Sequence, residues 1–177
     1  MGHSPAGVPV LLGDLTVTLI NDQLEELHRF AAGKPEHFLI CATCSPDARI
    51  WKLPYFTRSR AAKGTIVWSQ EGGVTREFDL PHPQGLAASD FSPDSSQLIT
   101  IDGDGVVRFW RTRDGQIEKS VKLAELKGGS YDDINARSRS GLWHETVADG
   151  SKRLNRYRFF DLDSGKDRKS TRLNSSH

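Results

Sequence analysis

The sequence predicts an all-β protein built from four-stranded antiparallel sheets in tandem. A Ser-Pro-Asp triplet occurs at 45–47 and again 47 residues later, and Ser4-Pro5 lies 41 residues before the first triplet. Each copy is followed by an apolar strand, a Gly- or Asp-containing turn and a second strand that ends in a large apolar residue. Helical patterns are nearly absent: only QLEELHRFAA could pass as a helix, and its place in the repeat favours a strand. Such spacing of short strands and turns is typical of a repeated β-module.

The apolar residues that end these second strands define the repeat. They are spaced by 48, 42 and 50 residues, and they are Ile20, Trp68, Trp110 and Phe160. A turn and a further strand follow the first three, at 24–30, 74–80 and 117–123. We therefore expect four repeats, approximately 1–30, 37–80, 84–123 and 131–166, each contributing one sheet.

Composition favours an ordinary folded protein. Hydrophobic residues make up 36% of the 177 residues, and the formal net charge is +1. Balanced charge argues against nucleic acid as a partner, and no apolar run approaches the roughly 18 residues of a membrane helix. We expect a cytoplasmic protein without membrane association.

The last eleven residues, DRKSTRLNSSH (167–177), form a separate segment. They lack aromatic residues and periodicity, so we expect them to be disordered. Their back-translation resembles a sequencing-library adapter, which predicts a non-native tail and a longer natural chain. Leaving out Asp167, Arg168, Lys169 and Arg172 changes the 24 basic and 23 acidic residues to 21 and 22, a net charge of −1.

The stretch FSPDSSQLITIDGDGVVRFWRTRDGQ (91–116) resembles a WD40 repeat, and RFFDLDSGK (158–166) resembles the end of another. The resemblance covers about residues 1–166 and is strongest at 92–116. It implies a partial β-propeller, in which four-stranded antiparallel blades surround a central channel. It also implies a non-catalytic scaffold that binds protein partners.

The resemblance implies structural roles for six residues: Trp68, His82, Thr100, Asp104, Trp110 and Phe160. In the best repeat, His82, Thr100, Asp104 and Trp110 would form the hydrogen-bond network that stabilises a WD40 blade. The sequence departs from the family where Arg follows Trp110 and Ser follows Trp68, in place of the usual Asp. The alternative is the non-catalytic propeller of a larger hydrolase or of a TolB-like periplasmic protein, in which Ser-Pro-Asp repeats also occur.

No motif predicts catalysis, a cofactor or a metal site. Cys41 and Cys44 have CxxC spacing but lack a second ligand pair and a helix N-terminus, so we expect buried structural thiols. The segment Asp102–Gly105 resembles part of a calcium loop, but the required Glu is replaced by Arg111. We expect a hairpin turn there.

Two basic loops are the candidate binding site. TRSRAAKG (57–64) and DGSKRLNR (149–156) occupy equivalent positions in two repeats, where the best repeat has a short turn. We expect both loops on one rim of the propeller, binding an acidic or phosphorylated protein or peptide through charge-assisted hydrogen bonds. The candidate residues are Arg58, Arg60, Lys63, Lys152, Arg153 and Arg156. The alternative interpretation is that these side chains only keep exposed loops solvated and bind no ligand.

Overall fold

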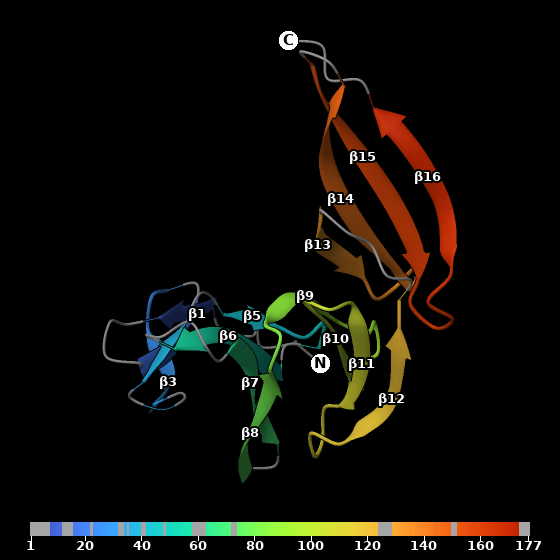
Figure 1. The fold of residues 1–177 in the computed structure, drawn as a ribbon. Coiled ribbons are helices and arrows are strands. Elements are labelled where there is room, and N and C mark those ends of the chain that lie inside the picture. Colours follow the sequence, from blue (N-terminus) through green and yellow to red (C-terminus); the bar gives the residue numbers. More distant parts are fainter. Residues whose placement is uncertain are drawn as a thin grey trace. The chain divides into compact units, whose positions relative to one another are not determined.

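The structure is a computed structural model, and it describes residues 8–11, 16–21, 23–31, 34, 36–39, 42–47, 49–57, 63–71, 74–123, 129–149 and 152–173. The described residues form β-strands joined by turns and contain no helix, which confirms the predicted all-β class (Figure 1). The chain divides into two compact units, Met1–Pro83 and Gln84–His177. Each unit contains two antiparallel sheets.

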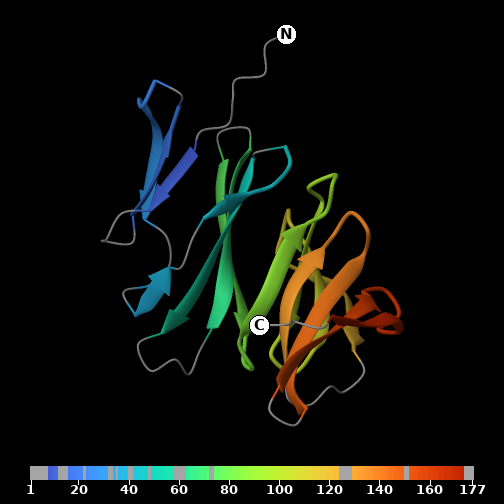
Figure 2. The same ribbon diagram turned by 90° about the horizontal axis from the view of Figure 1, so that it is seen from above.

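The first unit contains sheet 1 and sheet 2. Sheet 1 has the order β1-β2-β3, and sheet 2 has the order β4-β6-β7-β8 with β5 also paired to β6 (Figure 2). The strands of sheet 1 are β1 (Val8–Leu11), β2 (Thr16–Ile20) and β3 (Glu26–Ala31). Those of sheet 2 are β4 (His37–Leu39), β5 (Thr43–Cys44), β6 (Ile50–Thr57), β7 (Lys63–Glu71) and β8 (Val74–His82). Because β4 and β5 pair with opposite ends of β6, they act together as one interrupted edge strand of a four-stranded sheet.

The second unit contains sheet 3 and sheet 4, each a four-stranded meander (Figure 1). The strands of sheet 3 are β9 (Leu86–Phe91), β10 (Gln97–Asp102), β11 (Val106–Arg111) and β12 (Ile117–Lys122). Those of sheet 4 are β13 (Gly129–Asn135), β14 (Ser140–Asp149), β15 (Lys152–Asp161) and β16 (Asp167–Leu173). Repeated four-stranded antiparallel sheets without helices are the architecture of a partial β-propeller.

The core of the second unit lies between sheets 3 and 4. Ile99, Ile101 and Phe109 of sheet 3 belong to the same buried cluster as Trp143 and Phe160 of sheet 4. Central strand β10 is buried from Leu98 to Asp102, whereas edge strand β12 is almost entirely exposed. This matches the sequences of the two strands: QLITID, in the central strand, is mostly apolar, and IEKSVK, in the edge strand, is mostly polar.

Residues 167–173 contradict the expectation of disorder. They form the edge strand β16, which pairs with β15 from Phe160↔Asp167 to Asn155↔Leu173. Composition misled the prediction because an edge strand gains its order from backbone hydrogen bonds to its neighbour and needs few apolar side chains. The adapter origin of this segment stays a prediction.

A charged cluster joins the edges of sheets 3 and 4. In the turn after β15, Asp163 accepts hydrogen bonds from Arg139 Nη2 at 2.7 Å and from Lys119 Nζ at 3.0 Å. The Arg139 guanidinium also lies over the ring of Phe109, 4.4 Å from its centroid. The hydrogen bonds from Arg139 and Lys119 hold the pKa of Asp163 well below its usual range. Asp163 is therefore ionised in the folded protein at neutral pH and links β12 to sheet 4.

We predict that Asp163→Asn lowers the free energy of unfolding by about 1 kcal/mol at neutral pH, a modest value because solvent screens the partly exposed cluster. Because the pKa of Asp163 is lower in the folded protein than in the unfolded chain, its ionised carboxylate stabilises the fold at pH values above the ordinary carboxyl pKa of 3.8. This stabilisation is lost as the pH falls through the pKa that Asp163 has in the folded protein. The difference from wild type should therefore shrink below about pH 4.

Urea unfolding at a series of pH values measures this difference. Asp104→Asn, at an exposed carboxylate in the same unit, serves as the control and should change little. A difference that stayed constant from neutral pH down to about pH 2 would contradict the ion-pair account of Asp163.

Candidate functional site

The turn between β10 and β11 is organised by the buried carboxylate of Asp102, which is 1% exposed. Its Oδ1 accepts hydrogen bonds from the backbone N–H groups of Asp104 at 3.1 Å and Val106 at 2.9 Å. Its Oδ2 accepts a hydrogen bond from Arg108 Nη1 at 2.7 Å. With both oxygens engaged in this way, the carboxylate holds the hairpin together and is a poor candidate for a general base.

Gly105 completes the turn. Its φ is +76°, and a Cβ at this position would lie 2.1 Å from the hydroxyl of Tyr131 on β13. Glycine is therefore required both by the left-handed backbone and by the close approach of sheet 4. The expected hairpin turn at Asp102–Gly105 is confirmed.

The structure places the Trp110 indole next to Thr100 in the interior of sheet 3. Trp110 Nε1 donates a hydrogen bond of 2.8 Å to Thr100 Oγ1, and both residues are buried. His82 is also fully buried, but it belongs to the other compact unit. Phe160 is fully buried on β15, and Trp68 lies on β7, where its side chain is outside the described residues. The structural roles expected for these residues stay predictions.

Asp104 does not have the position that the family resemblance implies. Its side chain is exposed, and its carbonyl oxygen accepts a hydrogen bond from Lys122 Nζ at 2.6 Å. Asp102, two residues earlier, supplies the carboxylate that holds the turn. The sequence could not show which of the two aspartates holds the turn, because Asp102-Gly and Asp104-Gly are both suitable turn sequences.

The candidate basic residues are only partly described. Arg58 and Arg60 lie outside the described residues, and Lys63 and Lys152 lie at the first positions of β7 and β15, with their side chains outside them. The two basic loops belong to different compact units, so the expectation that they share one rim stays a prediction.

The two described side chains of this set differ in environment. Arg156 Nη1 lies 2.5 Å from Glu145 Oε1, and this buried Glu145 comes from the cross-strand position on β14. Arg156 is thus already paired with a carboxylate. Arg153 is exposed near the end of the β14–β15 hairpin, opposite the small Ala148. Of the two, Arg153 is the more exposed.

Two other features bear on chemistry. Within the described ranges, no three His, Cys, Asp or Glu side chains converge in a way that could hold a metal ion. Cys44 is exposed, which contradicts the expectation of a buried thiol, because β5 is a two-residue edge strand. Cys41 lies outside the described residues. No helix in the described part of the chain is long and apolar enough to cross a membrane.

Sequence reasoning missed the contacts that join sheets 3 and 4. Asp90 Oδ2 accepts a hydrogen bond of 2.9 Å from the backbone N–H of Ala136, and Arg139 reaches both Asp163 and Gln97. Arg139 has a φ of +53° and Ser95, in the equivalent turn of sheet 3, has a φ of +61°. An alignment of these two turns would have shown that Arg139 occupies the place of Ser95. The two repeats differ in this turn in both sequence and length, so the sequence does not reveal that alignment.

Comparisons with known proteins support the fold alone. No protein-family model matches the chain, and no curated protein sequence matches it. Among solved structures, a chain of hydrazine synthase from Kuenenia stuttgartiensis, a propeller-containing protein, is similar with a TM-score of 0.57 and 11% sequence identity. The similarity covers 90% of this chain and 43% of that one, so this chain spans less than half of its length.

The Asp102 turn gives a testable contrast between two neighbouring carboxylates. Asp102→Asn removes a buried charge that is paired with Arg108, so it should lower the free energy of unfolding by about 1–3 kcal/mol. Asp104→Asn changes an exposed side chain, so its effect should be within about 0.5 kcal/mol.

Thermal and urea unfolding of both variants measure this contrast. Equal effects, or a larger effect for Asp104→Asn, would show that Asp104 holds the turn as the family resemblance implies.

Proposed function

We propose that this chain is a non-catalytic WD40-type propeller module that binds a protein or peptide partner, with an acidic or phosphorylated segment as the ligand. The observation that carries the proposal is the contrast between interior and loop side chains. Asp102, Thr100 and Trp110 are buried and bonded within sheet 3, whereas Arg153 is exposed near a hairpin end. A rigid scaffold with charged loops is suited to recognition.

The β14–β15 hairpin supplies the positive charge of the proposed site. Its two strands have 10 residues each, longer than the 6 of β10 and of β11, so the hairpin extends beyond the shorter turn of sheet 3. Lys152 and Arg153 begin β15 at this end. Arg153 is exposed at this end, whereas Arg156 is half-buried further along the hairpin, so the proposed ligand contacts are the residues nearer its end.

The chemistry of guanidinium groups favours an acidic or phosphorylated ligand. Arginine presents several N–H donors in a planar fork that matches the oxygens of carboxylate and phosphate. Hydrogen bonds between charged partners are shorter and stronger than neutral ones. Arg58, Arg60 and Lys63 of the other basic loop belong to the same proposal on the basis of their equivalent place in the repeat.

We expect reversal of four charges, Arg58→Glu, Arg60→Glu, Lys152→Glu and Arg153→Glu, to weaken binding of a phosphoserine-containing acidic peptide by about 10-fold or more. Fluorescence anisotropy with a labelled peptide measures the change, and the unphosphorylated peptide shows what the phosphate adds.

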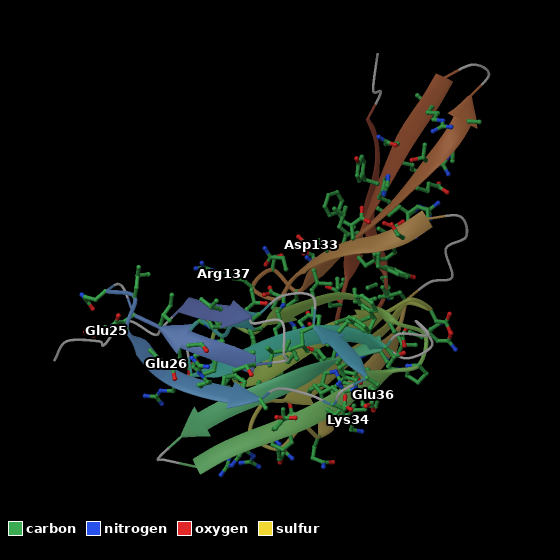
Figure 3. All side chains as sticks on the ribbon, turned by 90° about the vertical axis from the view of Figure 1, so that its left-hand side faces the viewer. Glu25, Glu26, Lys34, Glu36, Asp133 and Arg137 are labelled. Atoms are coloured by element: carbon green, nitrogen blue, oxygen red, sulfur yellow. The ribbon has the colours of Figure 1, made fainter. Side chains whose placement is uncertain are left out.

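The control is Arg137→Glu, which lies in the exposed turn after β13 and is labelled in Figure 3. It changes charge on the same protein away from the hairpin end. Equal loss of affinity in the control and in the fourfold variant would point to a general charge effect and contradict the proposed site. Unchanged affinity in the fourfold variant would contradict it as well.

A further inference from the structure

The β14–β15 hairpin continues past the part of sheet 4 that packs on sheet 3. Strand pairing in sheet 3 stops at Ile101↔Val107. The corresponding pair of sheet 4, His144↔Tyr157, is followed by further pairs, which form the hairpin extension (residues 145–156). The buried apolar cluster shared by sheets 3 and 4 contains no described residue of this extension. Its side chains therefore do not contribute to the apolar core between the two sheets.

The hairpin extension has two different sides, because side chains alternate along each strand. Glu145 and Arg156 are register partners on one side, where their side chains pair at 2.5 Å. Arg153 and Asn155 lie on the other side, two positions apart on β15, which corresponds to about 7 Å along the strand. The carboxylate of Glu145 thus lies on the side opposite to Arg153 and Asn155.

The Arg153 guanidinium has a small cross-strand neighbour. Arg153 is exposed, and its register partner is Ala148. Residues directly opposite each other on paired strands are close neighbours, and the single methyl group of alanine leaves space beside the guanidinium. The planar donors of arginine match the oxygens of a phosphate group. One strong anion-binding group is therefore in place on this side of the hairpin extension.

Thr146 orients the carboxamide of Asn155. The two residues are register partners, and Thr146 Oγ1 donates a hydrogen bond of 3.0 Å to Asn155 Oδ1. The carboxamide oxygen is thereby engaged, whereas Nδ2 of Asn155 has no hydrogen-bond partner among the described residues. An amide Nδ2 carries two hydrogens and accepts none. Asn155 thus adds neutral donors to the side that carries Arg153.

We propose that Arg153 and Asn155 form a phosphate subsite within the proposed binding site, and that Asn155 gives this site its preference for phosphoserine or phosphothreonine over a carboxylate. A bidentate pair with arginine engages both oxygens of a carboxylate. A phosphate group has three strong acceptor oxygens, so one oxygen remains for the Nδ2 donors. The subsite rests on the proposed function and assigns its phosphate preference to one side chain.

Fluorescence anisotropy with a phosphoserine peptide and its unphosphorylated counterpart tests the subsite. Asn155→Ala should weaken binding of the phosphorylated peptide by about 10-fold, because it removes a hydrogen bond to a charged group. The unphosphorylated peptide should bind as it does to wild type. Thr146→Val removes only the hydroxyl that orients the carboxamide, so it should give a smaller loss, about 3-fold, again for the phosphorylated peptide alone.

The matched control is Asn135→Ala. Asn135 is an exposed asparagine of the same sheet, and its Oδ1 also accepts one hydrogen bond, from the backbone N–H of Ser138 at 2.9 Å. It lies at the β13–β14 turn, at the other end of β14 from the hairpin extension. The control variant should bind both peptides as wild type does. Circular dichroism verifies that all variants are folded.

Failure of the subsite and failure of the proposed function give different results. Suppose the fourfold charge reversal abolishes binding of both peptides, whereas Asn155→Ala keeps the wild-type ratio of the two affinities. The proposed function then stands and the subsite is overturned. Equal affinity of wild type for the two peptides would overturn the subsite as well.

If wild type binds neither peptide, the proposed function fails and inorganic phosphate decides the subsite. Titration of the isotopically labelled chain is followed by nuclear magnetic resonance at the side-chain amide signals of Asn155. Shifts of these signals that are absent in Arg153→Glu would support a phosphate subsite. Signals that do not move with phosphate would overturn it.

Discussion

The packing of sheet 3 against sheet 4 is the interaction on which the rest of the second unit depends. Phe109, Trp143 and Phe160 are at most 1% exposed, and each large apolar side chain removed from water contributes about 1.5–3 kcal/mol. Neither sheet could bury its apolar residues alone, because a four-stranded meander has two faces and few residues. The Asp163 cluster and the Asp90–Ala136 hydrogen bond then fix how the two sheets align. Apolar burial thus supplies the stability, and these polar contacts supply the register.

Because stability and alignment come from the packed parts of the strands, the hairpin ends can differ between repeats. The turn at Asp102–Gly105 is short and closed by hydrogen bonds, whereas the β14–β15 hairpin is extended and basic. Both are supported by the same kind of packed strands, so a change at the end of one hairpin need not disturb the core. The interior polar groups Thr100, Asp102 and Trp110 of sheet 3 bond within that sheet, so they hold the scaffold while the hairpin ends vary.

The strand pattern was predictable because its causes are local. Spaced apolar runs and turn residues located the strands, including β3 (Glu26–Ala31), whose sequence could pass as a helix. The sheet-to-sheet contacts of Arg139 and Asp90 were not predictable, since each joins residues more than 40 positions apart in the sequence. Asp102 was missed in favour of Asp104 because both precede a glycine. The order of β16 was missed because an edge strand depends on its neighbour more than on its own composition.

Hydrogen exchange of the full chain, with and without Trp143→Ala, tests most directly whether sheets 3 and 4 share one core. Trp143 belongs to sheet 4 but packs in the cluster that contains Ile99 and Ile101 of β10. Its removal should therefore speed amide exchange in β10 and β11 of sheet 3 as well as in β14 and β15, while strands of the first unit keep their rates. Faster exchange confined to sheet 4 would contradict the shared core and, with it, the face-to-face packing on which this account of the protein rests.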